Sequence, residues 1–110
     1  MNLVQRPPPS WMARNPIQPL ELAMALLLTL HRVADYDAWR KVYDSVADMQ
    51  AAAEVTSESV HRMVDDPNNV LVLHYFDSVD KARAFTTLPQ LKDAMQRAGV
   101  QGEPRFEFFE

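Results

Sequence analysis

Three histidines are the side chains of this chain best suited to chemistry near neutral pH. His31, His61 and His74 all fall in stretches that we expect to form neighbouring strands of one sheet. An imidazole can exchange a proton near neutrality, which makes it suitable for general acid or base catalysis. We predict His31 and His74 as the catalytic candidates because their strands should be central in the sheet. The chain has no cysteine, which excludes disulfides and thiol chemistry.

The hairpin between the second and third expected strands decides whether the histidines share a face. A four-residue loop over residues 66–69 would pair His61 directly with His74. A five-residue loop that starts at Asp65 would place these two on opposite faces, because side chains alternate along a strand. The sequence leaves both registers open. It also leaves open a purely structural role, with the histidines hydrogen-bonded in an interface or at strand ends.

Neighbouring imidazoles are also potential ligands of zinc or iron. The three histidines do not show the close spacing of a helix or turn that is typical of metal ligands. A metal site also usually has supporting second-layer groups. We therefore predict no metal site and no cofactor.

Aromatic and apolar side chains recur every three or four residues over residues 36–53 and 79–98, which predicts two amphipathic helical regions. We expect six of them to form the wall of a flat apolar slot against the sheet and to contact a substrate: Tyr36, Trp39, Tyr43, Phe85, Leu91 and Met95. The tyrosines and a histidine would supply the few polar contacts that such pockets use. The same spacing is also typical of an ordinary core, so a slot filled by side chains is the alternative.

Start and stop signals define the expected elements. Asp35 is placed to cap the first helix, and Asp77 or Ser78 the second. Pro89 predicts a break near Leu88 in the second helical region, and Gly99 predicts its end. The expected strands cover residues 24–33, 58–64, 70–76 and 105–109.

The resulting order, strand–helix–strand–strand–helix–strand, is the ferredoxin-like arrangement of the α+β class, with one four-stranded antiparallel sheet. All four strands look apolar on both faces, whereas two helical regions can cover only one face. We therefore predict a homodimer in which two sheets face each other and form an α+β barrel.

Composition limits the other possibilities. The 110 residues fit one domain over residues 24–110, preceded by a proline-rich arm at residues 1–23 that is either flexible or packed on the partner. The net charge of −4 without a basic run argues against nucleic acid and anionic membranes as partners. The apolar run at residues 24–30 is too short to span a bilayer. We expect a cytoplasmic protein.

Three segments resemble a known superfamily. Residues 31–40 (HRVADYDAWR) resemble a strand-to-helix junction of the dimeric α+β barrel proteins, residues 65–70 (DDPNNV) their hairpin, and residues 91–100 (LKDAMQRAGV) their second helix and its stop. The superfamily includes antibiotic-biosynthesis monooxygenase-like proteins, polyketide cyclases, haem-degrading monooxygenases and stress-responsive barrel proteins. The resemblance implies a homodimer with a cavity in each subunit between sheet and helices.

The resemblance and the predicted slot together favour a protein that binds a small apolar or aromatic molecule. One hypothesis is a cofactor-independent monooxygenase or cyclase that acts on a small aromatic or polyketide-like compound. A second is a non-catalytic ligand-binding or stress-associated module. A third is a purely structural assembly with a filled slot. The sequence does not decide whether the protein is an enzyme.

Overall fold

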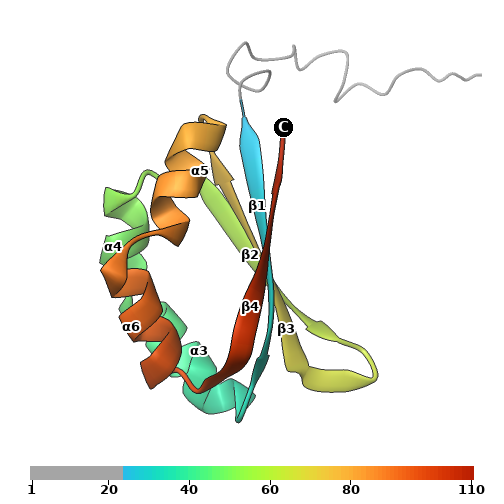
Figure 1. Ribbon diagram of the computed structural model, residues 1–110. Coiled ribbons are helices and arrows are strands. Elements are labelled where there is room, and N and C mark those ends of the chain that lie inside the picture. Colours follow the sequence, from blue (N-terminus) through green and yellow to red (C-terminus); the bar gives the residue numbers. More distant parts are fainter. Residues whose placement is uncertain (1–23) are drawn as a thin grey trace, which may run out of the picture.

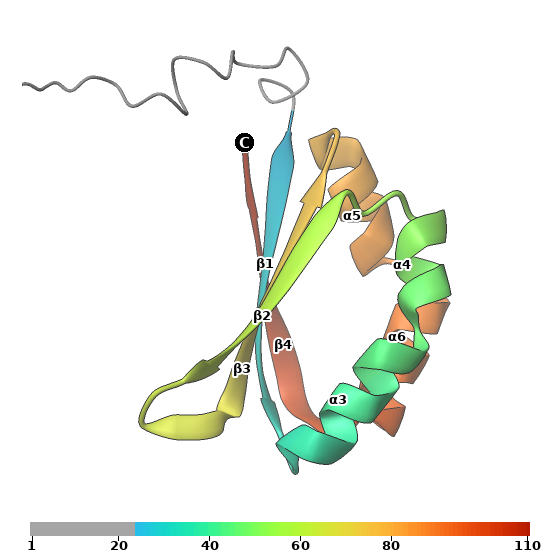
Figure 2. The same ribbon diagram turned by 180° about the vertical axis from the view of Figure 1, so that it is seen from behind.

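The computed structural model describes residues 24–110, so the expected proline-rich arm lies outside the described residues. The elements follow the chain as β1 (Ala25–Val33), α3 (Tyr36–Ser45), α4 (Ala47–Ala52), β2 (Ser57–Met63), β3 (Asp66–Phe76), α5 (Val79–Thr86), α6 (Pro89–Arg97) and β4 (Val100–Phe109). One antiparallel sheet has the strand order β2-β3-β1-β4. The helices α3, α4, α5 and α6 pack on one face of it (Figures 1 and 2). The predicted ferredoxin-like α+β fold is confirmed.

The first helical region is two helices rather than the one continuous helix expected. It begins as predicted, with the Asp35 carboxylate accepting a hydrogen bond of 3.1 Å from the backbone N–H of Ala38. It breaks at Val46, between α3 and α4. The hydroxyl of Ser45 donates a 2.6 Å hydrogen bond back to the carbonyl of Val42. Such local bonds from serine compete with the helical ladder and bend a helix, which accounts for the break.

The second helical region follows the sequence signals. The Ser78 hydroxyl accepts a 3.2 Å bond from the N–H of Lys81 at the start of α5. Leu88 has an extended backbone because Pro89 follows it, and α6 restarts with Pro89 in its first turn. Gly99 then adopts a φ of +81°, a left-handed conformation that glycine takes without a Cβ penalty.

The hairpin between β2 and β3 has neither the four-residue nor the five-residue loop that the sequence left open. Met63 pairs with Asp66 across a two-residue turn, so β3 begins four residues earlier than predicted. The Arg62 guanidinium donates a 3.0 Å bond to the carbonyl of Pro67 and helps to keep that segment extended. In this register His74 pairs with Glu58, and His61 lies on the opposite face of the sheet from His74.

Strand β4 is also longer than predicted, because it begins at Val100 rather than at Arg105. Its pairing with β1 shifts between Leu30 and Arg32, and Gly102 within the irregular stretch has a φ of +71°. Residues 102–104 of β4 therefore bulge beside β1 instead of pairing with it regularly.

The two faces of the sheet differ in how they are covered. Beneath the helices lie alternate side chains of the two central strands, and they form the core: Ala25, Leu27, Thr29, His31, Val33, Val70, Val72, His74 and Phe76. The other face, here called the open face, presents half-buried apolar side chains of the same strands: Leu26, Leu28, Leu30, Leu71, Leu73 and Tyr75. The expectation that all four strands are apolar on both faces is wrong for β2, which is polar and largely exposed. It is also wrong for the open face of β4, where Arg105 and Glu107 lie beside Leu30 and Leu28.

Within residues 24–110, none of the helices has the length and apolar character needed to cross a membrane.

Candidate functional site

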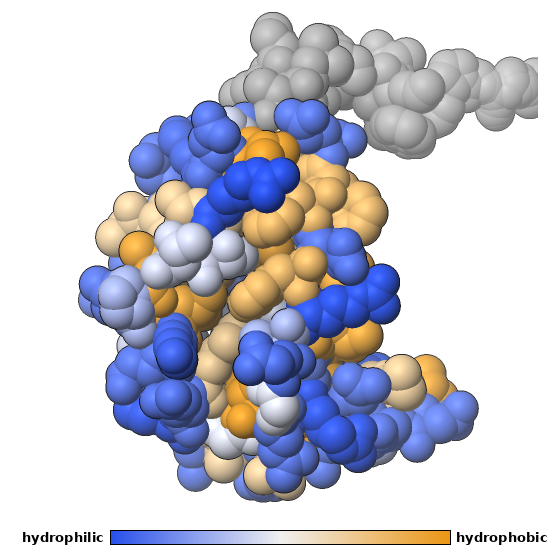
Figure 3. All heavy atoms as spheres, in the orientation of Figure 1, coloured by the Kyte–Doolittle hydropathy of each residue, from blue (hydrophilic) through white to orange (hydrophobic). Residues whose placement is uncertain are grey.

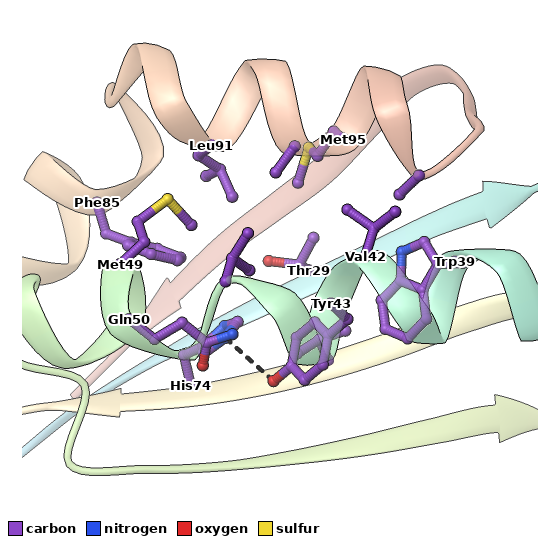
Figure 4. A pocket seen from close by; sticks show the side chains of 14 residues that line it. Thr29, Trp39, Val42, Tyr43, Met49, Gln50, His74, Phe85, Leu91 and Met95 are labelled. Atoms are coloured by element: carbon purple, nitrogen blue, oxygen red, sulfur yellow. Dashed lines mark hydrogen bonds between the residues drawn. The ribbon is translucent and has the colours of Figure 1, made fainter.

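A small cavity lies between the helices and the helix-covered face of the sheet (Figure 4). Its volume is about 40 Å³, and its walls are almost entirely apolar. The lining comes from all four helices and from β1 and β3: Thr29, Trp39, Val42, Tyr43, Val46, Met49, Gln50, Val72, His74, Phe85, Leu91, Ala94, Met95 and Ala98.

Most of the predicted site residues meet at this cavity. His74 from β3 and five of the expected wall residues line it: Trp39, Tyr43, Phe85, Leu91 and Met95. The helical spacing that predicted a common wall therefore does bring these side chains together, with those of α3 facing those of α5 and α6 (Figure 4).

Two predicted residues, Tyr36 and His31, lie outside the lining. The Tyr36 ring stacks on Trp39 with centroids 5.7 Å apart, and the Arg62 guanidinium covers the tyrosine at 3.9 Å. His31 contacts Trp39, with ring centroids 5.6 Å apart. Trp39 thus stands next to both residues and is itself part of the cavity wall. Both are neighbours of the cavity rather than parts of its wall.

His74 is the ionisable group buried in the wall of the cavity, with 5% of its surface exposed. Desolvation by burial lowers its pKa from 6.5 to about 4, and the negative charge of Glu58 acts in the opposite direction. The imidazole is therefore neutral at pH 7. Its Nδ1 has no hydrogen-bond partner, and its Nε2 lies 3.5 Å from the Tyr43 hydroxyl oxygen.

A chain of polar groups leads from His74 to the edge of the sheet. The Tyr43 hydroxyl donates a hydrogen bond to the Glu58 carboxylate, which the β2–β3 register places opposite His74. Burial, followed by the bond to Glu58, raises the pKa of Tyr43, so the phenol keeps its proton. Because that proton is directed to Glu58, the phenol oxygen can only accept from His74. This assigns the imidazole proton to Nε2 and leaves a lone pair on Nδ1.

Three polar residues of this region were missed from the sequence. Glu58 could be found only from the hairpin register, which the sequence left open. Gln50, on α4, is buried in the lining and lies beside His74 and Tyr43 in Figure 4. Thr29 precedes His31 by two positions in β1, so strand alternation alone places both on the helix-covered face. That alternation was the available signal.

His31 is an isolated polar group in the core. It is 5% exposed, and neither ring nitrogen has a hydrogen-bond partner. Desolvation lowers its pKa from 6.5 to about 4. With no polar side chain or charge to orient it, His31 lacks the environment that His74 obtains from Tyr43 and Glu58.

His61 does not join the other histidines. It is exposed on the open-face side of β2, where its Nε2 lies 2.9 Å from the hydroxyl of Ser59. Within the described part of the chain, residues 24–110, no three His, Asp or Glu side chains are grouped so that they could hold a metal ion.

Comparison with known proteins identifies solved structures that share this architecture. No model of a protein family and no curated protein matches the chain. Among solved structures, SnoaB, a cofactor-independent oxygenase from Streptomyces nogalater, superposes with a TM-score of 0.66 at 13% identity, covering 80% of this chain and 92% of SnoaB. An antibiotic biosynthesis monooxygenase-like protein from Bordetella bronchiseptica gives a TM-score of 0.69 at 11% identity, with coverages of 80% and 96%. Another from Caulobacter crescentus gives 0.64 at 19%, with coverages of 79% and 88%.

At identities this low, the TM-scores show a shared fold and nothing beyond it. The chain has the α+β fold of these antibiotic biosynthesis monooxygenase-like structures, as the resemblance of its sequence predicted.

Proposed function

We propose that this protein binds a small aromatic molecule at the cavity and oxidises it with dioxygen, without a cofactor, using His74 as the general base. The observation that carries this proposal is the buried, neutral His74, whose Nδ1 is unpartnered while its Nε2 faces the Tyr43 hydroxyl, which in turn donates to Glu58. The fold shared with the oxygenase SnoaB is consistent with it. The reaction type and the substrate class are part of the proposal.

Proton abstraction is the step that these residues can perform. His74 Nδ1 accepts a proton from an acidic O–H or C–H of the substrate, and the resulting imidazolium donates through Nε2–H to the Tyr43 oxygen. The Tyr43 hydroxyl donates its own hydrogen bond to the Glu58 carboxylate, whose negative charge stabilises the imidazolium. This arrangement, a base oriented by a third group, is the general logic of catalytic triads. The apolar wall keeps water away from the anion that forms.

Oxidation then needs only the substrate anion and dioxygen. For an activated methylene, R₂CH₂ + O₂ gives R₂C=O + H₂O. The carbon is oxidised from CH₂ to carbonyl, one oxygen atom enters the product, and the other is reduced to water with the two hydrogens lost from the carbon. Electrons and atoms balance without an external reductant. The protein contributes the base, the dry cavity and the orientation of the substrate.

We also propose that the protein is a homodimer, which the apolar open face of the sheet supports. Its central residues, Leu28, Leu30, Leu71 and Leu73, belong to the two central strands and are flanked by polar side chains of β2 and β4. A large apolar patch with a polar rim is typical of a protein–protein interface. A second copy, packed sheet to sheet, would cover it and close the barrel.

Residence in the cytoplasm stays a prediction, which fractionation of cells can test.

Anthrone is a suitable test compound because it has an activated methylene and gives anthraquinone and water on reaction with dioxygen. Wild-type protein should consume oxygen and form anthraquinone, measured with an oxygen electrode and by absorbance.

His74→Gln should lower kcat about 100-fold or more, the range that a general base supplies. Tyr43→Phe, which removes the hydroxyl, should lower kcat less. His61→Gln, on the other side of the sheet, is the matched control and should retain activity. Undiminished turnover in His74→Gln would refute the role of His74.

The alternative is a module that binds without converting its ligand. It predicts that aromatic compounds raise the melting temperature but remain chemically unchanged during incubation in air. The small volume of the cavity, about 40 Å³, favours instead a purely structural assembly with a filled slot, which predicts that these compounds leave the melting temperature unchanged.

A further inference from the structure

We infer that the surface groove between α6 and β4 is the mouth and outer half of the binding site, and that it accepts an aromatic molecule carrying a carboxylate. This inference rests on the proposed function of the inner cavity. The groove, here called the α6–β4 groove, is lined by the following residues: Thr86, Leu91, Lys92, Met95, Gln96, Val100, Gly102, Glu103, Pro104 and Phe106.

The inner cavity is too small to hold an aromatic ligand by itself. At about 40 Å³ it has room for two or three water molecules, whereas pockets for drug-sized ligands measure roughly 300–1,000 Å³. The α6–β4 groove has a volume of about 380 Å³ and shares Leu91 and Met95 with the inner cavity. These two side chains are therefore the partition between the two spaces. Met95 is half-buried, and the unbranched side chain of methionine changes rotamer easily.

The irregular start of β4 shapes the outer wall of the groove. The bulge between the pairings of Leu30 and Arg32 carries Gly102 and Pro104, both of which line the groove. Gly102 has a φ of +71°, which is strained for residues with a Cβ, and this conformation turns the strand away from regular pairing. In the view of Figure 1, α6 and β4 lie toward the reader, and Figure 3 shows apolar surface exposed between the helices and that strand.

A second groove also meets the inner cavity, but a salt bridge spans it. This groove, between α4 and α5, measures about 390 Å³ and shares Met49 and Phe85 with the cavity. Lys81 of α5 and Glu54, which follows α4, both line it, and their Nζ and Oε1 atoms lie 2.9 Å apart. The ion pair ties the two helical segments together across that opening. No ion pair among residues 24–110 crosses the α6–β4 groove in the same way.

Charge on the rim of the α6–β4 groove indicates the ligand class. Lys92, on the α6 side, forms no ion pair with any carboxylate of residues 24–110. Leu91, Met95 and Phe106 supply apolar surface suited to a ring. Glu103, on the β4 side, has the opposite charge and would repel an anion. The carboxylate of the ligand is therefore expected next to Lys92, and the aromatic ring of the ligand is expected to extend past Met95 toward the inner cavity.

Two exposed positions allow a matched test of the mouth. Gln96→Trp fills the α6–β4 groove, and Ala52→Trp fills the α4–α5 groove; both residues are exposed, so neither change disturbs the core. The probes are naphthalene-1-carboxylate and the uncharged 1-naphthalenemethanol, with binding measured by calorimetry. We expect Gln96→Trp to weaken the binding of both probes at least tenfold, and Ala52→Trp to change it less than twofold.

The lysine is tested with the same two probes. Lys92→Met should weaken binding of the carboxylate about threefold, as expected for a surface ion pair, and leave the alcohol within twofold. Lys92→Arg should restore the carboxylate affinity. Equal losses for both probes in Lys92→Met would overturn the assignment of the ligand charge.

Other outcomes separate this inference from the proposed function. If Gln96→Trp binds both probes and oxidises anthrone like wild type, the mouth lies elsewhere, while His74 keeps its proposed role. The same holds if Ala52→Trp is the variant that weakens binding. If wild-type protein binds neither probe, the inference on the groove is overturned, and anthrone turnover separately decides the proposed function.

Discussion

Replacing His31 with leucine should make the protein more stable, and the gain should grow as the pH falls. His31 is buried in the core next to Trp39, and both of its ring nitrogens lack hydrogen-bond partners. A buried polar group without a partner costs about 1–3 kcal/mol. Leucine has a similar volume and no polar atoms. At pH 7, we expect His31→Leu to raise the free energy of unfolding by about 1 kcal/mol or more.

The pH dependence follows from the lowered pKa of His31. In the unfolded chain a histidine takes up a proton near pH 6.5, whereas the buried His31 does so only near pH 4. Between these values the unfolded state binds one more proton than the folded state. The free energy of unfolding therefore falls by about 1.4 kcal/mol per pH unit as the pH decreases. His74 has the same lowered pKa and contributes an equal slope.

Chemical denaturation at fixed protein concentration, repeated from pH 7 to pH 5, measures this slope. Carboxylates contribute little in that range because their ordinary pKa values lie near 4. Between pH 6.5 and 5, wild type should lose about 3 kcal/mol, and His31→Leu or His74→Leu about 1.5 kcal/mol. The double variant should be nearly independent of pH. A His31→Leu protein that is less stable than wild type at pH 7, or that keeps the full slope, would refute this reasoning.

Three further substitutions test the fold and the assembly. Leu27→Ala removes a fully buried core side chain and should lower the free energy of unfolding by about 2–5 kcal/mol in a denaturation curve. Asp35→Ala removes the helix cap of α3 and should cost about 1 kcal/mol by the same measurement. Leu28→Glu places a charge at the centre of the open face beside Glu107, and should convert the proposed dimer into monomers in analytical ultracentrifugation; a dimer that persists would argue against sheet-to-sheet packing.

The sequence predicted the order of elements and the positions of helix caps well, because those signals are local. The cap at Asp35, the break before Pro89 and the left-handed Gly99 each depend on a few neighbouring residues. The longer β3 and β4 were not predictable in the same way. Their first residues are held by contacts with a neighbouring strand. In β3, for example, the Asp66 carboxylate forms an ion pair with the Arg32 guanidinium of β1. That interaction joins residues far apart in the chain.

The candidate site was predicted only in part, because some of its residues are positioned by contacts between distant parts of the chain. Helical spacing was sufficient to bring Trp39, Tyr43 and Met95 to one cavity. The partner that distinguishes His74 from His31 is Glu58, and its position depends on a hairpin register that turn residues alone left open. The size of the cavity depends on how the side chains pack, which the pattern of residue types does not encode.

The side-chain nitrogens of His74 offer the most direct test of the proposed site. Long-range ¹H–¹⁵N NMR at pH 7 reports the charge of the ring and which nitrogen carries the proton. We expect a neutral imidazole with its proton on Nε2, facing Tyr43, and a bare Nδ1. A charged imidazolium at pH 7, or a proton on Nδ1, would contradict the assignment of His74 as a general base.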